Sequence, residues 1–234
     1  MNSTRVEDRI IVALDFDSAA AARCLVERLG EHASFYKIGL QLLTAEGPAV
    51  VRELITAGKQ VFLDLKLHEI PNSVAGAVAA CGALGVSFVT VHASGGSAVL
   101  RAAVDAARPF PQLRVLALTV ITSLRDEDLA EIGVGATVKQ QVLRLAQLAA
   151  RAGCHGVVAS PQEAAFLRQA LPLDMLIIAP GTQMPGEKGN DQARIATPVE
   201  ALRAGATHLV VGRGVTKAPD PLAAFVAICD HCNK

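Results

Sequence analysis

Two charged residues, Asp64 and Lys66, lie two positions apart in an apolar segment that begins at Gln60. Side chains alternate between the two faces of a β-strand, so a strand here would point both charges, together with Phe62, to the same side. Removing a charge from water costs several kcal/mol unless the charge is paired. Stability alone would favour apolar residues at these positions, and we therefore interpret the pair as functional.

Further charges lie at the ends of neighbouring apolar segments. Asp15 and Lys37 end the first two segments, and Glu69 follows shortly after Lys66. Opposite charges around an amine favour its cationic form, so we expect Lys66 to be an electrostatic stabiliser and proton donor rather than a Schiff-base amine. Two other interpretations stay open. The charges could form a structural ion-pair network, or the carboxylates could hold Mg²⁺, although the lysine already supplies positive charge there.

Glycines next to two later segment ends favour an anion site. Pro180 and Gly181 follow one apolar segment, and Gly212, Arg213 and Gly214 follow the last one. Exposed backbone N–H groups in such turns, together with one basic side chain, bind phosphate in many barrels. We expect Arg213 to supply the charge, and ordinary turns are the alternative.

The segment 181–197 is polar, rich in glycine and longer than the roughly 2 to 6 residues of most such loops. We interpret it as a lid. Its closure would bring Gln183 and Gln192 onto the ligand and expel water, which strengthens electrostatic interactions inside the site. The alternative is a surface loop without that role.

Eight apolar segments carry these groups, and helical patterns separate them. Each segment is nearly continuous in Val, Ile and Leu, as are parallel strands covered on both faces. This alternation predicts an α/β fold, a single (β/α)8 TIM barrel of residues 1–234, with an open doubly wound sheet as the alternative. Functional groups of such barrels lie at the C-terminal strand ends. The expected strands begin at Arg9, Phe35, Gln60, Val86, Arg114, His155, Met175 and His208.

Glycine and proline mark the expected helix boundaries. A glycine in left-handed conformation often follows the last residue of a helix, and proline is favoured at the first helical position. Pro71 and Asp220 indicate the starts of two helices. Four helices are expected to end at Gly58, Gly85, Gly153 and Gly205.

The composition describes a neutral protein with a large core. Hydrophobic residues make up 51% of the chain and charged residues 19%, while 22 Lys and Arg balance 22 Asp and Glu. No overall field attracts nucleic acid or an anionic membrane. The chain shows neither a membrane span of about 20 apolar residues nor a secretory signal at its start, so we expect a cytoplasmic protein with a small-molecule partner.

The five cysteines do not predict a metal site. Cys24, Cys81 and Cys154 lie in apolar patterns where small buried side chains are expected. Cys229 and Cys232 form a CxxC motif in the last helical pattern, but no second pair of ligands lies near them in the sequence. We therefore expect no metal.

The segment 63–74, LDLKLHEIPNSV, resembles the D-x-K-x-x-D-I-P-x-T signature of the orotidine 5′-phosphate decarboxylase family. Other motifs follow in the family's order over the whole chain. The resemblance implies conversion of orotidine 5′-monophosphate to uridine 5′-monophosphate and CO₂, the last step of pyrimidine synthesis, without metal or organic cofactor. These motifs are ALD at Asp15, YKIG at Lys37, TVHASGG from Thr90, TSL at Thr122, PG at Gly181, DQ at Gln192 and VVGR at Arg213.

The resemblance also implies a role for each site residue. Lys66 would protonate C6 of the pyrimidine as CO₂ leaves, with Asp64 beside the departing carboxylate. Asp15 and Lys37 would hold the ribose hydroxyls. The pyrimidine edge would meet Thr122 or Ser123, the phosphate would meet Gln192, Gly212 and Arg213, and further substrate contacts would come from Ile70, Pro71, Ser73, Pro180 and Gln183.

Three positions depart from the family pattern. In the family, the acid five residues after the first Asp crosses a two-fold interface into the partner's site, which implies a homodimer with shared active sites. Glu69 stands at that position in place of Asp. Ser73 replaces Thr, and Gln183 replaces an Arg that is frequent in bacterial members.

Two rival functions remain. The first is a Mg²⁺-dependent sugar-phosphate decarboxylase or aldolase of the same superfamily, which shares the D-x-K-x-x-D motif but tends to carry Glu on the second strand, where this chain has Lys37. The second is a non-catalytic nucleotide-binding barrel in which Glu69 has spoiled the site. Ligand binding without turnover would indicate this second rival.

Overall fold

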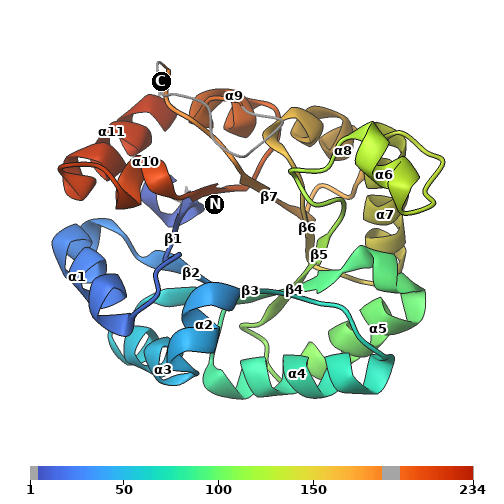
Figure 1. The fold of residues 1–234 in the computed structure, drawn as a ribbon, viewed down its shortest axis with the longest axis horizontal. Coiled ribbons are helices and arrows are strands. Elements are labelled where there is room, and N and C mark those ends of the chain that lie inside the picture. The colour runs from blue at the N-terminus through green and yellow to red at the C-terminus, as the bar shows by residue number, and fades with distance from the viewer. Residues whose placement is uncertain (1–4, 186–195, 234) are drawn as a thin grey trace.

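The structure is a computed structural model that describes residues 5–185 and 196–233. Within these ranges eight strands form a closed barrel in sequence order, each parallel to its neighbours, and β8 pairs with β1. Figure 1 looks down the barrel and shows the ring of strands inside a ring of helices. The predicted (β/α)8 barrel is confirmed and the open sheet is excluded, while the extent of the domain over residues 1–234 stays a prediction.

Each predicted apolar segment contains one strand. The strands are β1 (Ile10–Ala13), β2 (Phe35–Gly39), β3 (Gln60–Leu67), β4 (Phe88–His92), β5 (Arg114–Leu118), β6 (Gly156–Val158), β7 (Leu176–Pro180) and β8 (His208–Val211). The α-helices are α1 (Ala19–Leu29), α2 (Leu40–Glu46), α3 (Ala49–Thr56), α4 (Pro71–Leu84), α5 (Gly96–Ala107), α6 (Asp126–Glu131), α7 (Val138–Arg151), α8 (Ala164–Ala170), α9 (Pro198–Arg203), α10 (Arg213–Thr216) and α11 (Pro221–Cys232). Short 3₁₀ helices are η1 (Val6–Arg9), η2 (Gly30–His32), η3 (Ala93–Gly95) and η4 (Pro161–Glu163). No helix of the described ranges has the length and apolar character to cross a membrane.

The predicted helix boundaries are confirmed. Pro71 is the first residue of α4, and the Asp220 side chain accepts a hydrogen bond from the backbone N–H of Ala223 at the start of α11. Gly85 ends α4 in the left-handed conformation with φ of 87°, where a side chain would be strained. The other predicted glycines, Gly58, Gly153 and Gly205, also have positive φ.

Two apolar clusters stabilise the barrel. The larger lies between the strands and the surrounding helices. The smaller fills the barrel interior, as expected for strands whose alternate side chains point inward. Asp64 follows Phe62 by two residues along β3, so its carboxylate lies above this apolar interior. The interior cluster consists of Ile11, Ala13, Phe35, Phe62, Phe88, Leu116, Leu118, Val158, Ile178 and Val210.

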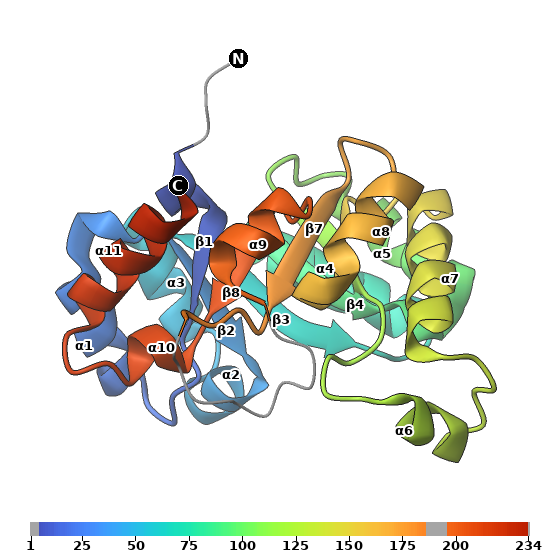
Figure 2. The same cartoon turned by 90° about the horizontal axis from the view of Figure 1, so that it is seen from above.

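The C-terminal ends of the strands lie on one side of the barrel. Figure 2 shows the helices and strands from a second direction. The short helices α2, α6 and α10, which follow β2, β5 and β8, lie on the side opposite the two termini. These connections leave the C-terminal ends of the strands. Charged residues predicted at the strand ends are therefore gathered on this side.

The expectation of three buried cysteines is partly wrong. Cys81 and Cys154 are buried, and burial raises the pKa of these thiols to about 11 and about 12. Cys24 is exposed, because α1 turns Ala22 and Leu25 toward the core instead. Apolar neighbours in the sequence do not by themselves specify which helix face a residue occupies.

A histidine at the N-terminal end of the barrel strands is expected to make stability depend on pH. The ring of His208, at the start of β8, meets those of Phe35 and Phe88 edge-on, with centroids 6.2 and 5.4 Å away. Burial lowers the pKa of His208 to about 4, and the charge of Arg9 acts in the same direction. Because the unfolded chain binds this proton near pH 6.5, the contribution of neutral His208 is complete above that pH and is lost as pH falls toward 4.

We expect His208→Gln to remove about 3 kcal/mol of the pH dependence between pH 7 and pH 4. The free energy of unfolding, measured with urea at several pH values, checks this. His32→Gln removes an exposed histidine and should keep the wild-type dependence. Equal pH dependence in His208→Gln and wild type would contradict the prediction.

Candidate active site

A cavity of about 420 Å³ opens at the C-terminal ends of the strands. This volume lies within the range of small-molecule sites, and the position is the one where barrels carry their functional groups. Apolar side chains of the barrel interior form its floor, and charged and polar groups line its walls. The residues predicted for the site that line this cavity are Asp15, Lys37, Asp64, Lys66, Thr122, Ser123, Pro180, Gly212 and Arg213.

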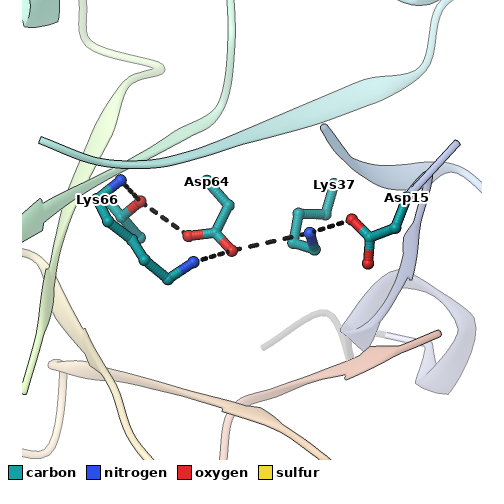
Figure 3. A network of polar contacts seen from close by, with 5 residues as sticks. Asp15, Lys37, Asp64 and Lys66 are labelled. Atoms are coloured by element: carbon teal, nitrogen blue, oxygen red, sulfur yellow. Dashed lines mark hydrogen bonds and ion pairs between the residues drawn. The ribbon is translucent and has the colours of Figure 1, made fainter. Parts of the chain in front are cut away.

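Four of these residues form an alternating chain of charges across β1, β2 and β3 (Figure 3). The Nζ of Lys66 lies 2.7 Å from Oδ2 of Asp64, and the Nζ of Lys37 lies 3.8 Å from the same oxygen. On its other side, Lys37 donates a hydrogen bond of 2.8 Å to Oδ1 of Asp15. The charges that the sequence placed at separate strand ends therefore meet at one rim.

The chain of charges is most buried at its centre. The side chains of Lys37 and Asp64 are 11% and 12% exposed, whereas those of Lys66 and Asp15 are 35% and 55% exposed. Desolvation is costly for the two central ions, and their mutual contacts offset this cost. The more accessible Lys66 ammonium and Asp15 carboxylate face the cavity and can contact a ligand there.

The backbone at Lys66 departs from a regular strand. Its φ of 50° is the only positive value at a non-glycine residue within the described ranges. The pairing of β3 with β4 is irregular at the same place, because Leu63 pairs with Val89 and Leu67 pairs with Val91. Such bulges re-aim side chains and are frequent near active sites, while left-handed backbone is a strain for a residue with Cβ.

Several residues predicted to contact substrate do not line the cavity. Glu69 and Ile70 are exposed, and Pro71 and Ser73 lie in the first turn of α4. A hydrogen bond with the Ser73 side chain, and to a lesser extent one with the backbone of Ile70, holds the pKa of the Glu69 carboxyl below its usual value. The contact of these residues with substrate stays a prediction.

The predicted lid is only partly described. The side chain of Gln183 is buried, with 6% exposed, and does not line the cavity. Its backbone N–H donates to the carbonyl of Ala196, which joins the two ends of the segment. Gln192 lies outside the described residues, so closure of this segment and both glutamine contacts stay predictions.

Sequence reasoning missed the apolar floor of the cavity and one buried polar residue beneath it. Phe62, Leu118, Val158 and Val210 contribute to the floor. Thr90 is fully buried on β4 and hydrogen-bonds to Asp64. Strand alternation counted from Phe88 places Thr90 on the inward face, and this signal could have found it.

The described ranges contain no group of three or more His, Cys, Asp or Glu side chains arranged to hold a metal ion. Cys229 is buried and Cys232 is partly buried in α11. Burial raises the pKa of these two thiols to about 12 and about 11. A thiol with a raised pKa is a poor metal ligand, because the thiolate is the form that binds.

Comparison with known proteins relates this barrel to one family. The model of the family described as "Orotidine 5'-phosphate decarboxylase / HUMPS family" matches residues 8–228. A protein from Moorella thermoacetica named orotidine 5′-phosphate decarboxylase is 48% identical over 229 residues, which cover 95% of this chain and 91% of that protein. Its namesake from Anaeromyxobacter dehalogenans is 48% identical over 221 residues, covering 94% of this chain and 96% of the other.

A solved structure agrees with these relatives. The crystal structure of orotidine 5′-phosphate decarboxylase from Lactobacillus acidophilus superposes with a TM-score of 0.87 at 36% identity, covering 96% of this chain and 99% of that one. Both the sequence matches and the fold extend over nearly the whole chain. The chain therefore belongs to the orotidine 5′-phosphate decarboxylase / HUMPS family, a family of enzymes.

Proposed function

We propose that the protein decarboxylates orotidine 5′-monophosphate to uridine 5′-monophosphate and CO₂, the last step of de novo pyrimidine synthesis. Relatives that carry the name of this enzyme over nearly the whole chain support the proposal. The observation that carries it is the Lys66 ammonium, which lies in the cavity wall 2.7 Å from Asp64. A fixed cation is the group that this reaction requires.

The chemistry explains this requirement. When the bond between C6 and the carboxylate breaks, CO₂ leaves and the bonding electron pair stays on C6, where no conjugated group delocalises it. A positive group held beside C6 stabilises that charge without having to reorganise. Lys66 then donates a proton to C6 to form the product and regains one from water, which its partly exposed side chain can reach.

The other charged residues serve to position the substrate. Asp64 would lie beside the departing carboxylate and hold Lys66 through their ion pair. Asp15 and Lys37 would bind the ribose hydroxyls, since a carboxylate accepts and an ammonium donates hydrogen bonds. Their 2.8 Å contact supports this role because it presents acceptor and donor side by side. Thr122 and Ser123, on the opposite wall, would meet the pyrimidine edge.

The phosphate would bind away from C6, between the ends of β7 and β8. Gly212 and Arg213 line the cavity there, and Pro180 lies beside them in the same wall. Arg213 would form charge-assisted hydrogen bonds to the phosphate, joined by Gln192. Binding energy from this remote group can drive closure of the segment 181–197 and so assist the chemical step.

A direct assay tests the proposed function. We expect the purified protein to convert orotidine 5′-monophosphate at the same rate with and without a chelator. The loss of substrate absorbance measures this rate. The cationic Lys66 supplies the charge that a metal would otherwise contribute. Binding without turnover would indicate a non-catalytic nucleotide-binding barrel, and activity restored only by Mg²⁺ would indicate metal-dependent chemistry. Either result contradicts the proposal.

We further infer a homodimer in which Glu69 enters the partner's active site. Glu69 is exposed and lies outside the cavity of its own subunit, and the neighbouring Ile70 is a large apolar side chain that is 61% exposed. Leu40, at the start of α2, is 59% exposed. Burial of these two side chains in a subunit interface would remove their apolar surface from water. The neutral net charge supports the absence of nucleic-acid and membrane partners. We also propose a cytoplasmic location.

Mixed subunits test the shared site. Glu69→Ala and Lys66→Ala are each expected to be inactive, and an equal mixture exchanged into dimers should regain about a quarter of the wild-type sites. Half of the dimers are then mixed, and in each mixed dimer one of the two sites combines an intact Lys66 with an intact Glu69 from the other subunit. Turnover per total subunit measures this recovery. An inactive mixture whose subunits have demonstrably exchanged would contradict sharing.

A further inference from the structure

We infer that Thr90 is a positioning residue for the decarboxylation proposed above: its hydroxyl holds both Asp64 and the strained backbone of Lys66. Thr90 lies on β4 and its side chain is fully buried. It does not line the cavity, so it does not contact a ligand there. Its effect on the reaction must pass through the residues that it contacts.

Thr90 lies opposite the irregular part of β3. Leu63 pairs with Val89 and Leu67 pairs with Val91, so Thr90 alone stands opposite the three residues 64–66. A regular pairing would match these residues one to one. The extra residues of β3 leave backbone groups without their usual partners on β4, and a buried N–H without a partner destabilises the fold.

The Thr90 hydroxyl compensates for this mismatch. Its Oγ1 accepts a hydrogen bond of 2.9 Å from the backbone N–H of Lys66. An N–H can only donate, so the single hydroxyl proton remains available, and it is donated to Oδ1 of Asp64 over 2.9 Å. One side chain thus satisfies the backbone at the bulge and one oxygen of the central carboxylate.

Both hydrogen bonds help to fix the position of the Lys66 ammonium. The contact with Asp64 orients its carboxylate so that Oδ2 faces Lys66 at 2.7 Å and Lys37 at 3.8 Å. The contact with the backbone holds Lys66 at φ of 50°, a conformation that persists only when the surroundings stabilise it. Without the hydroxyl, we expect Lys66 to relax and its ammonium to move away from the position that catalysis needs.

Substitutions that keep or remove the hydroxyl test the proposal. Thr90→Val keeps the shape of the side chain, and we expect kcat for orotidine 5′-monophosphate to fall about 30-fold or more with KM within about threefold of wild type. Thr90→Ser keeps the hydroxyl and should retain kcat within about threefold. If Thr90→Val does not fold, Thr90→Ala replaces it as the test, because alanine also lacks the hydroxyl and is smaller than threonine.

Thr207→Val is the matched control. The Thr207 hydroxyl also accepts from a backbone N–H and donates to an oxygen, both of Ile177 and both at 3.0 Å, but it lies just before β8 at the other end of the barrel. The control should keep wild-type kcat. A wild-type kcat in Thr90→Val, an equal loss in Thr90→Ser, or an equal loss in Thr207→Val would each overturn the assignment.

A crystal structure of Thr90→Val separates this inference from the proposed function. We expect the Lys66 backbone to leave the left-handed region and its contact with Asp64 to lengthen. If the wild-type protein does not turn over orotidine 5′-monophosphate, the proposed function is wrong. The crystal structure of Thr90→Val then tests the positioning role of Thr90 without reference to that reaction. Unchanged Lys66 geometry in that variant would overturn the positioning role, whatever the substrate is.

Discussion

Replacing Lys66 by alanine should lower kcat for orotidine 5′-monophosphate by about 10⁴-fold or more, because the variant loses both the cation that stabilises the carbanion and the proton donor to C6. The fold should persist, since Asp64 keeps its contacts with Thr90 and Lys37. We expect the melting temperature to change by less than about 4 °C. Single-turnover assays and thermal unfolding measure the two effects.

A distant lysine provides the control for Lys66→Ala. Lys139 lies in α7 on the outer layer, with its Nζ 5.5 Å from the centroid of the Phe166 ring. Lys139→Ala should retain wild-type turnover. If Lys66→Ala turned over substrate at a rate close to wild type, the proposed proton donor would be wrong, and the charge chain would then be interpreted as structural.

Replacing Arg213 by alanine should lower kcat/KM by about 100- to 1000-fold, equal to about 3 to 4 kcal/mol, because a charge-assisted contact with the phosphate is lost. The loss should depend on the phosphate. With orotidine, which lacks that group, Arg213→Ala and wild type should react at the same rate. Steady-state kinetics with both substrates measure this difference.

The control for Arg213→Ala removes an exposed arginine elsewhere. Arg151 ends α7 and is not among the residues that line the cavity, so Arg151→Ala should leave both kinetic constants unchanged. If kcat/KM were unchanged in Arg213→Ala, the proposed phosphate site at the end of β8 would be wrong. An equal loss with orotidine would instead indicate that Arg213 acts on the fold or on another part of the substrate.

Much of the fold could be predicted because its signals are local. Apolar runs of strand length alternate with helical patterns, and glycines with left-handed backbone end several helices, as at Gly85. Charges at run ends, such as Lys37 and Asp64, could be assigned to the barrel mouth by the general rule for these folds. Which helix face is buried was less certain, and Cys24 was placed wrongly for that reason.

The order of the residues along the chain was sufficient to identify a parallel α/β barrel, to place Asp15, Lys37, Asp64 and Lys66 at its strand ends, and to indicate the family. Only the folded chain brought these groups within 2.7 to 3.8 Å of one another. The left-handed backbone at Lys66 and the two contacts of Thr90 also appear only there. They depend on how β3 pairs with β4 across the bulge, and the stagger of strands in a closed barrel is set by the whole ring of strands rather than by a local sequence pattern.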